Sequence, residues 1–397
     1  MKMWKDKFVF VTVILSGLLM VFSCNQDPIF FKISHETLPE KPRVQGGPTN
    51  IVEFERNGTF IMYVASGSLH WYTGASGWDS PGYYIPPLSG RVIGLAATMD
   101  HLYALCISEP GVIATLWRIG HTETFWTNIP IIDSTYILIQ TIYADPDTDR
   151  LFAGARNNKG NDYGILVCDP TPPASLPFLR LLQGNTEMLT GAASDTSGNY
   201  YLSTGFPDTG KKGGVYKVDS ALSSITHLGG GNLMGMIKLK DPAKTIIVIE
   251  RENGMLYMVT VTGVFPLGLA AAINKWTTGA MAIWENVVNP AEKMLIVGIQ
   301  GGLYSTSSSS SFKHGYVEFY LTAAGALDPT RPRNDPPTIT VANSDQYQGS
   351  LGKHPINFMH QTSTAVDPNR LFFVSTQAAG LWSYKRRSDG LQWNAED

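Results

Sequence analysis

The chain repeats a pattern in which two short apolar runs flank a polar, glycine-containing turn. In residues 199–219, the runs at 200–202 and 215–218 are typical of β-strands, and the residues between them are rich in Gly, Pro, Asp and Lys. Two strands this close in sequence predict an antiparallel hairpin. Six further copies begin at Thr59, His101, Arg150, Thr245, Lys293 and Arg370.

The copies recur at a nearly constant spacing. One anchor residue marks the second strand of each hairpin, and five of the six intervals between anchors are 41 to 50 residues. One four-stranded blade of a β-propeller uses about 40 to 50 residues. The last interval is longer, and residues 305–356 are interpreted as an insertion between the sixth and seventh units. The anchors are His70, Trp117, Leu166, Tyr216, Tyr257, Tyr304 and Trp382.

A further apolar run precedes most hairpins, separated from them by a turn that is several times Asp-Pro or Asn-Pro. Proline disfavours helix at the residue before it, so these turns end strands. The runs at 246–249, 294–297 and 371–374 are apolar at consecutive positions, as expected of strands covered on both faces. Residues 50–397 are therefore predicted to form an all-β, seven-bladed β-propeller of four-stranded antiparallel blades. A β-sandwich and an eighth, irregular sheet inside the insertion are the alternatives.

The first 24 residues form a separate signal. Lys2, Lys5 and Lys7 precede an apolar run at 8–20, which is short for a bilayer core of about 30 Å. Residues 21–24, Val-Phe-Ser-Cys, resemble the bacterial lipobox, with valine and phenylalanine in place of the usual leucine and small residue. The resemblance implies that residues 1–23 are a lipoprotein signal peptide and that Cys24 is acylated. An ordinary secretory signal with an incidental cysteine is the alternative.

A lipid anchor implies a location in the bacterial cell envelope, where the outer membrane or cell surface is favoured over the inner membrane. Residues 24–49 contain four prolines and a Gly-Gly pair, which predicts a tether. Within the tether, residues 29–33 are strand-like. We expect this strand to close the ring by pairing with the last sheet near Gln392 and Trp393, because an open sheet edge needs cover.

Composition narrows the classes of partner. Only 16% of the residues are charged and the formal net charge is −3. Removal of residues 1–23 takes away three lysines and one aspartate, so the charge becomes −5. Such a chain lacks the basic surface that nucleic acids require, so no nucleic-acid partner is expected. Cys106 and Cys168 lie in predicted strands of neighbouring units and are expected to be buried free thiols.

The predicted loops differ between the two ends of the blades. The Asp-Pro turns are short and alike, which predicts a structural role for that end. The opposite end carries long polar loops, and variable loops on a rigid scaffold are common binding sites. Solvated turns without a partner are the alternative. The candidate residues for binding a protein partner in the cell envelope are Arg156, Asn158, Lys159, Asp162, Lys211, Lys212 and Arg251.

The sequence contains no motif that predicts catalysis, a metal or a cofactor. His314, His354 and His360 have no ligand spacing, and residues 229–232 lack the lysine and serine or threonine of a phosphate loop, which favours a tight turn. The repeats resemble WD40, NHL and calcium-lactonase propellers in architecture alone. A lactonase-like hydrolase or a small-ligand binder using the central tunnel is the alternative function, with Glu250 and Glu285 as its few acidic candidates.

Overall fold

The structure is a computed structural model of the whole chain. It divides into residues 1–41 with 397, and Pro42–Glu396. All described residues belong to the second unit: 44, 48–74, 77–78, 90–107, 114–130, 136–157, 159, 163–168, 179–185, 187–205, 213–267, 277–287, 289–299, 316–328, 330, 355–376, 380–387 and 390–396. No helix in these ranges is long and apolar enough to cross a membrane.

The described residues form strands and no helices, which confirms the all-β prediction. The strands make seven antiparallel sheets of three or four strands, and within each sheet the strands follow one another in chain order. The first four sheets comprise β1 (Asn50–Arg56), β2 (Thr59–Ser66) and β3 (Ser68–Tyr72); β4 (Arg91–Ala97), β5 (His101–Ile107), β6 (Ala114–Gly120) and β7 (Thr127–Ile129); β8 (Leu138–Ala144), β9 (Leu151–Arg156), β10 (Tyr163–Cys168) and β11 (Leu179–Asn185); and β12 (Met188–Ser194), β13 (Tyr200–Gly205), β14 (Gly214–Val218) and β15 (Ile225–Gly229).

The remaining three sheets have the same order. They comprise β16 (Leu233–Lys238), β17 (Ile246–Glu250), β18 (Leu256–Thr260) and β19 (Gly263–Pro266); β20 (Thr277–Glu285), β21 (Lys293–Ile299) and β22 (Tyr316–Leu321); and β23 (Ile356–Gln361), β24 (Phe372–Thr376), β25 (Gly380–Arg387) and β26 (Gly390–Ala395).

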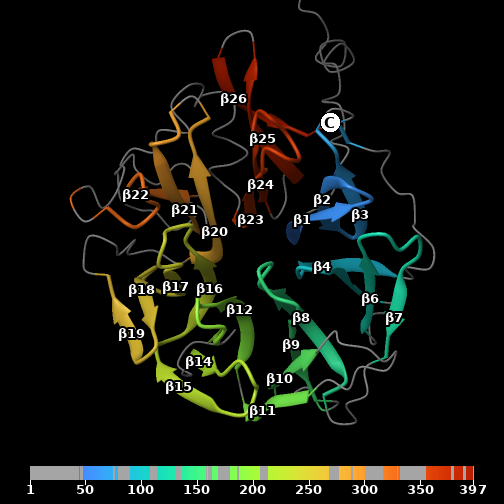
Figure 1. Cartoon of the computed structure of the whole chain (residues 1–397), viewed down its shortest axis with the longest axis vertical. Coiled ribbons are helices and arrows are strands. Elements are labelled where there is room, and N and C mark those ends of the chain that lie inside the picture. Colours follow the sequence, from blue (N-terminus) through green and yellow to red (C-terminus); the bar gives the residue numbers. More distant parts are fainter. Residues whose placement is uncertain are drawn as a thin grey trace, which may run out of the picture. The chain divides into compact units, whose positions relative to one another are not determined.

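The sheets are arranged around a common centre, as in a β-propeller. The first strand of each sheet contacts the first strand of the next, in the order β1, β4, β8, β12, β16, β20 and β23, and β23 contacts β1. Figure 1 shows these strands at the centre and the last strand of each sheet at the periphery. The two layers of the β-sandwich alternative do not occur in this arrangement.

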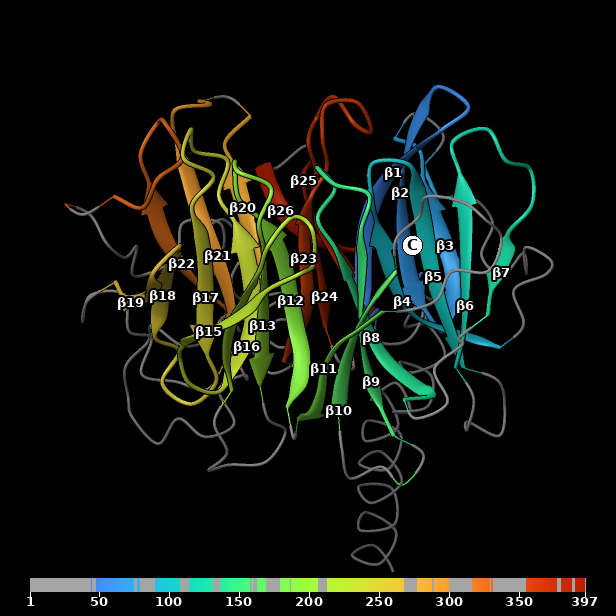
Figure 2. The same cartoon turned by 60° about the horizontal axis from the view of Figure 1, so that its bottom comes forward.

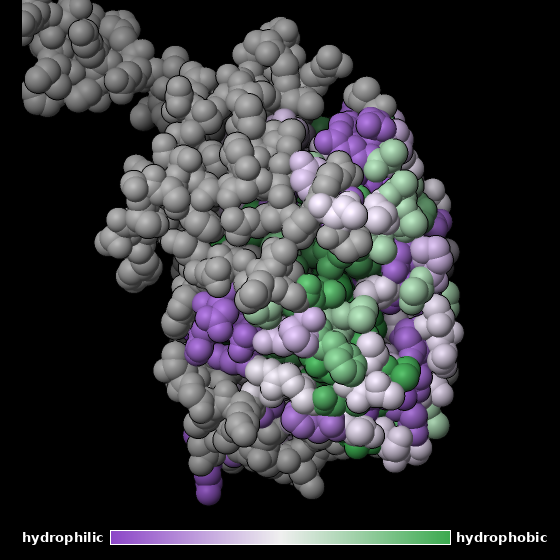
Figure 3. Space-filling model, turned by 90° about the vertical axis from the view of Figure 1, so that its left-hand side faces the viewer, coloured by the Kyte–Doolittle hydropathy of each residue, from purple (hydrophilic) through white to green (hydrophobic). Residues whose placement is uncertain are grey.

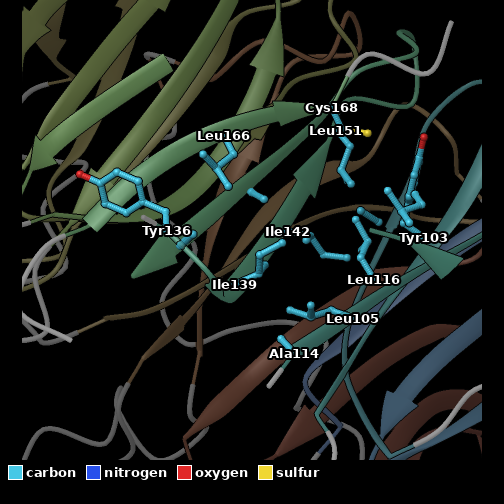
Figure 4. Close-up of a cluster of buried hydrophobic side chains, with 14 residues drawn as sticks. Tyr103, Leu105, Ala114, Leu116, Tyr136, Ile139, Ile142, Leu151, Leu166 and Cys168 are labelled. Atoms are coloured by element: carbon cyan, nitrogen blue, oxygen red, sulfur yellow. The ribbon is translucent and has the colours of Figure 1, made fainter. Parts of the chain in front are cut away.

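A separate hydrophobic cluster fills each junction between neighbouring sheets. In the junction between the second and third sheets, Leu105 and Leu116 pack against Ile142 and Leu151 (Figure 4). Equivalent clusters of described residues occupy the other six junctions, including the one between the seventh sheet and the first. Each sheet therefore buries both faces against its neighbours, which a single sheet could not do alone.

This packing explains the apolar runs without alternation. In β17, Ile246 and Val248 belong to the cluster shared with the fourth sheet, whereas Ile247 and Ile249 belong to the cluster shared with the sixth. Successive side chains of a strand point to opposite faces, so a strand covered on both faces needs apolar residues at every position. The interpretation of these runs is confirmed.

The predicted hairpins correspond to β2–β3, β5–β6, β9–β10, β13–β14, β17–β18 and β24–β25. The sixth unit differs. There β21 pairs with β22, Tyr316–Leu321, which lies inside the range 305–356 interpreted as an insertion. Val317 and Phe319 of β22 are buried toward the fifth sheet and Tyr316 toward the seventh. The predicted anchor Tyr304 lies outside the described residues.

The first strands share a feature that was not predicted from the sequence. A register shift interrupts the first strand of all sheets except the first, and in four of them a glycine lies at or beside the shift. A Cβ atom on Gly235 would lie 2.1 Å from the carbonyl oxygen of Gly279, and one on Gly279 would lie 2.1 Å from that of Met234. Glycine therefore permits the close approach of neighbouring first strands.

The two ends of the strands form two different faces. The turn face carries the turns between first and second strands and between third and fourth strands, along the upper edge of Figure 2. The loop face carries the connections between second and third strands and those that lead to the next sheet. The chain enters β1 at Asn50 on the loop face. Residues 1–43, including the predicted signal peptide, Cys24 and the strand at 29–33, lie outside the described residues.

Candidate functional site

The loop face contains three of the predicted interaction residues among the described ones. Arg156 ends β9, and its guanidinium lies over the Tyr163 ring at 5.1 Å from the centroid. Lys159 lies in the following connection and is exposed. Stacking on Tyr163 limits the orientations of the Arg156 side chain, so the cation is held in place on this face.

Arg251 is positioned through its backbone. Its N–H donates to the carbonyl oxygen of Asn232 at 2.8 Å, and its carbonyl oxygen accepts from the N–H of Thr277 at 3.0 Å. The bond from Thr277 connects the fifth sheet with the first strand of the sixth. The fourth sheet lies between Arg251 and the pair Arg156 and Lys159, so the structure does not bring the three together. Asn158, Asp162, Lys211 and Lys212 lie outside the described residues.

Two carboxylates of the loop face accept hydrogen bonds from nearby hydroxyl groups. Glu187 accepts from Thr204 Oγ1 at 2.7 Å and from the Tyr216 hydroxyl at 3.4 Å. Glu250 accepts from the Tyr257 hydroxyl at 3.1 Å. Burial and the neighbouring Glu250 raise the pKa of Tyr257 to about 12, which keeps the phenol protonated as a donor. The loop face therefore presents charges of both signs.

The turn face is connected across sheets by buried polar groups. Asp145, which follows β8, is 2% exposed and accepts hydrogen bonds from the N–H and Oγ of Ser194 at 2.6 and 2.7 Å. Lys238 Nζ lies 2.5 Å from Asp145 Oδ2. Because these residues come from the third, fourth and fifth sheets, one carboxylate connects three sheets.

This ionic cluster continues toward the solvent. Asp147 lies 2.9 Å from Lys238 Nζ and 2.8 Å from Lys244 Nζ. Hydrogen bonds from the two lysines lower the pKa of the Asp147 carboxyl. The cluster has two carboxylates and two ammonium groups, so its formal charges cancel.

A second ion pair connects the sixth and seventh sheets. Arg370 Nη1 lies 2.6 Å from Glu285 Oε2, and Gln361 bonds to both the N–H and the carbonyl oxygen of Glu285. Burial would raise the pKa of Glu285, but the bond and charge of Arg370 outweigh it and lower the pKa. Glu250 and Glu285, the acidic candidates for a tunnel enzyme, are thus both engaged by groups of this chain.

The junction between the seventh and first sheets is closed by further polar contacts. The Tyr72 hydroxyl donates to Asp367 at 2.6 Å, and Trp78 Nε1 donates to Glu396 at 2.6 Å. Ser383 also donates to Glu396. Asp145 and Asp367, whose Asp-Pro turns were recognised in the sequence only as strand breaks, thus supply buried carboxylates that bond across sheets.

The other sequence hypotheses have definite outcomes where the residues are described. Cys106 and Cys168 are buried and are not joined in a disulfide, as expected. Gly229 and Gly230, with φ of 100° and 109°, lead from β15 to the next sheet. His360 contacts Glu53, while His314 and His354 lie outside the described residues. In the part of the chain that is described, no three His, Cys, Asp or Glu side chains are grouped as a metal site would require.

Several large apolar side chains are exposed on the turn face. Phe125 is 73% exposed in the turn between β6 and β7, and Met99 is 54% exposed in the turn between β4 and β5. Figure 3 views the side on which β18 and β19 lie and shows hydrophobic residues bordered by hydrophilic ones. Val261 and Phe265 of this fifth-sheet hairpin are also exposed.

Comparisons with known proteins show no relative by sequence: no family model matches, and no curated protein matches significantly. Among solved structures, the chain is similar to YCF48 from Cyanidioschyzon merolae, with 10% identity over 86% of this chain and 96% of that one, and a TM-score of 0.48. A candidate gluconolactonase has 9% identity over 90% and 93%, with a TM-score of 0.42. A GH74 xyloglucanase from Xanthomonas campestris has 12% identity over 90% and 55%, with a TM-score of 0.39.

Proposed function

We propose that this chain is a lipid-anchored, seven-bladed β-propeller that binds a protein partner in the cell envelope through its loop face. The observation that carries this proposal is the different use of charge at the two faces. On the turn face, buried Asp145 and partly buried Glu285 are paired with cations of other sheets. On the loop face, Arg156 and Lys159 present cations on sheets that are packed together at seven hydrophobic junctions.

The contacts of Glu250 and Glu285 favour binding over catalysis. Glu250 and Glu285 are the carboxylates that a lactonase-like site in the tunnel would use. Both have partners within this chain, the Tyr257 hydroxyl and Arg370 respectively. The Glu285 carboxylate holds the sixth and seventh sheets together, so it is poorly placed to serve as a base or metal ligand, because releasing it would break that contact. The contact of Glu250 with Tyr257 lies within the fifth sheet.

The anchor supports a location at a membrane outside the cytoplasm, with the outer membrane or the cell surface favoured. Acylation of Cys24 would leave residues 24–49 as a tether that leads to Asn50 on the loop face. Fully extended, these 26 residues span about 90 Å. A tether of this length would let the propeller bind a partner near the membrane while staying separated from the membrane surface.

Site-directed photocrosslinking tests the docking face in the lipid-anchored protein. A photoreactive residue replaces Lys159 on the loop face or, as the control, the exposed Thr124 on the turn face. We expect a discrete protein adduct from position 159 and none from position 124. Adducts from position 124 alone would move the docking surface to the turn face, and no adduct from either position contradicts a protein partner.

The anchor is tested separately by palmitate labelling. The natural chain should incorporate label and fractionate with membranes, and the Cys24→Ala variant should do neither. Incorporation that persists in the variant, or an intact mature mass that does not begin at Cys24, contradicts the lipoprotein assignment. This outcome leaves the photocrosslinking result unaffected.

A further inference from the structure

Large apolar side chains are exposed mainly on the turn face. Seven are exposed among the described residues, and five of these lie at or beside turns of that face. Of the other two, Ile137 lies on the loop face and Phe265 in the outer strand β19. Single exposed apolar residues are common, whereas a group held together on one face marks a binding surface. The five turn-face side chains are Phe60, Met99, Phe125, Val261 and Val287.

Three of these side chains come from turns that are joined to one another. The Asn57 N–H, in the β1–β2 turn, donates to the carbonyl oxygen of His121 in the β6–β7 turn at 2.9 Å. His121 Nε2 lies 2.8 Å from the carbonyl oxygen of Met99 in the β4–β5 turn. Phe60 follows the first of these turns, and Phe125 lies in the second. Phe60, Met99 and Phe125 form what we call the apolar patch, which spans the first and second sheets.

Further contacts hold the apolar patch in place. The Met99 N–H donates to the carbonyl oxygen of Thr148, in the turn between β8 and β9 of the third sheet, at 3.0 Å. The Gly120 N–H donates to the Glu123 carboxylate at 2.8 Å, within the turn that carries Phe125. Little conformational entropy is lost when a surface that is already ordered meets its partner, so the patch is suited to binding.

The rim of the apolar patch carries charges of both signs. Asp100 and Glu123 are exposed in the turns that carry Met99 and Phe125. Arg56 supplies a cation and donates to the carbonyl oxygen of Glu123 at 2.5 Å. Such a rim lacks the cluster of basic side chains by which a protein attracts anionic lipids. A partner with an apolar surface and no net charge fits the patch, and the interface of a zwitterionic lipid bilayer has both properties.

The place where the tether joins the propeller puts a membrane within reach of the apolar patch. Val44 is fully buried in the hydrophobic cluster between the seventh and first sheets. Residues 24–43 precede it and span about 70 Å when fully extended. A strand of seven residues, such as β1, is about 23 Å long. An acyl group on Cys24 can thus reach a bilayer at either face, so the tether permits separation from the membrane but does not impose it.

A lipid surface fits the turn face better than a second protein does. Val261 and Val287 expose apolar side chains at turns of the fifth and sixth sheets, across the ring from the apolar patch. A flat bilayer can meet apolar side chains on opposite sides of the ring at the same time, whereas one protein domain covers a compact area. Tethering also raises the effective concentration of lipid, so a contact too weak to hold a free protein becomes populated.

We propose that the turn face is a membrane-contacting surface, in which Phe60, Met99 and Phe125 insert into the interface of a zwitterionic lipid bilayer. This contact directs the loop face away from the membrane and toward a protein partner. The inference rests on the proposed lipid anchor, which brings the chain to the membrane. Because burial of apolar side chains drives the contact, added salt should not release it.

Photocrosslinking to lipid tests the contact in the anchored chain reconstituted into phosphatidylcholine vesicles. A photoreactive residue in place of Thr124, beside Phe125, should give an adduct heavier by one phospholipid, both at low salt and at about 1 M salt. Placed at Lys159 on the loop face, it should give about a tenth of that yield or less.

Two matched variants carry the photoreactive residue at position 124. The variant F60S/M99S/F125S should lower the lipid yield by about tenfold or more, because the side chains that insert are gone. The control Ile137→Ser removes an exposed apolar side chain of the loop face and should keep the natural yield. Should the triple variant fail to fold, Phe125→Ser alone changes a side chain that is 73% exposed and should still lower the yield.

Equal lipid yields from positions 124 and 159, or a folded variant that keeps the natural yield, overturn the proposal. An adduct between two copies of the chain at position 124, in place of lipid, does the same. Flotation with the vesicles judges the anchor separately. If Cys24 proves to be unacylated, its thiol is coupled to a maleimide phospholipid, and the same lipid adduct is expected. Failure of the anchor is thus distinguishable from failure of the membrane contact.

Discussion

Trp78 of the first sheet donates its indole N–H to the carboxylate of Glu396, which follows the last strand of the seventh sheet, with 2.6 Å between Nε1 and Oε2. Glu396 is 4% exposed and Trp78 is 6% exposed. The Glu396 carboxylate also accepts from Ser383, and the Glu396 N–H donates to the carbonyl oxygen of Leu381 at 3.0 Å. Residues 318 positions apart in the sequence thus join the two ends of the ring.

Removal of this carboxylate should weaken the closure. Glu396→Ala leaves the Trp78 N–H and the Ser383 hydroxyl without their acceptor in a buried site, which should lower the free energy of unfolding by about 3 kcal/mol. Urea unfolding followed by tryptophan fluorescence measures the change. Asp100→Ala, which removes an exposed carboxylate, is the control and should change stability by less than about 0.5 kcal/mol. Equal effects of the two substitutions contradict a role in closure.

Substitution of a first-strand glycine by alanine should destabilise the protein most where the new methyl group has least space. In Gly235→Ala the new Cβ would lie 2.1 Å from the Gly279 carbonyl oxygen, so neighbouring first strands must separate. We expect a loss of more than about 3 kcal/mol or failure to fold. Gly94→Ala is the matched control, because its Cβ would first meet Ile142 at 3.6 Å. Similar melting temperatures for the two variants contradict the close approach.

Lys238 and Lys244 provide another matched pair. Lys238→Met removes the cation beside Asp145, which is 2% exposed, and should cost about 2 to 3 kcal/mol because a buried carboxylate loses its counter-ion. Lys244→Met removes an exposed, solvent-screened pair with Asp147 and should have a much smaller effect. Chemical denaturation of both variants measures the difference. A larger effect for Lys244→Met is incompatible with the three-sheet contact.

The contact between Arg370 and Glu285 should contribute stability that depends on pH. The pKa of Glu285 is lowered in the folded protein, so the contribution is present above the carboxyl's unfolded pKa of about 4.3 and is lost as the pH falls through the folded value. Arg370→Gln should therefore lower the melting temperature at pH 6 and have less effect near pH 3. Calorimetry at both pH values measures this. A constant difference between the chains contradicts a lowered pKa.

Much of the sheet architecture could be predicted because each hairpin is formed by residues that are close together in the sequence. Residues 246–260 show an apolar run, a turn and a second run within one short stretch, and this local order is enough to place β17 and β18. The second hairpin strand of the sixth unit was wrongly predicted at Tyr304, because Leu303 and Tyr304 follow a turn at the expected distance. The strand actually used, β22, comes later and has the longer apolar run that two-sided burial requires.

The polar contacts between sheets could not be predicted in the same way. Asp145 and Lys238 are 93 positions apart, and their pairing depends on how the third and fifth sheets are placed around the fourth. The sequence nevertheless contains a recurring motif that marks the glycines of the first strands. The tripeptides Val-Ile-Gly, Leu-Thr-Gly, Leu-Met-Gly and Thr-Thr-Gly, which end at Gly94, Gly191, Gly235 and Gly279, recur where a register shift interrupts the first strand of a sheet.

The distance between the first and seventh sheets tests the closed ring most directly. Spin labels at exposed Thr59 of the first sheet and exposed Thr364 of the seventh report it, and labels at Thr59 and exposed Ser197 of the fourth sheet report the distance across the ring. The buried thiols of Cys106 and Cys168 should not compete for label. Double electron–electron resonance should give a shorter distance for 59–364 than for 59–197. A longer distance for 59–364 would mean an open row of sheets and would contradict the closed ring.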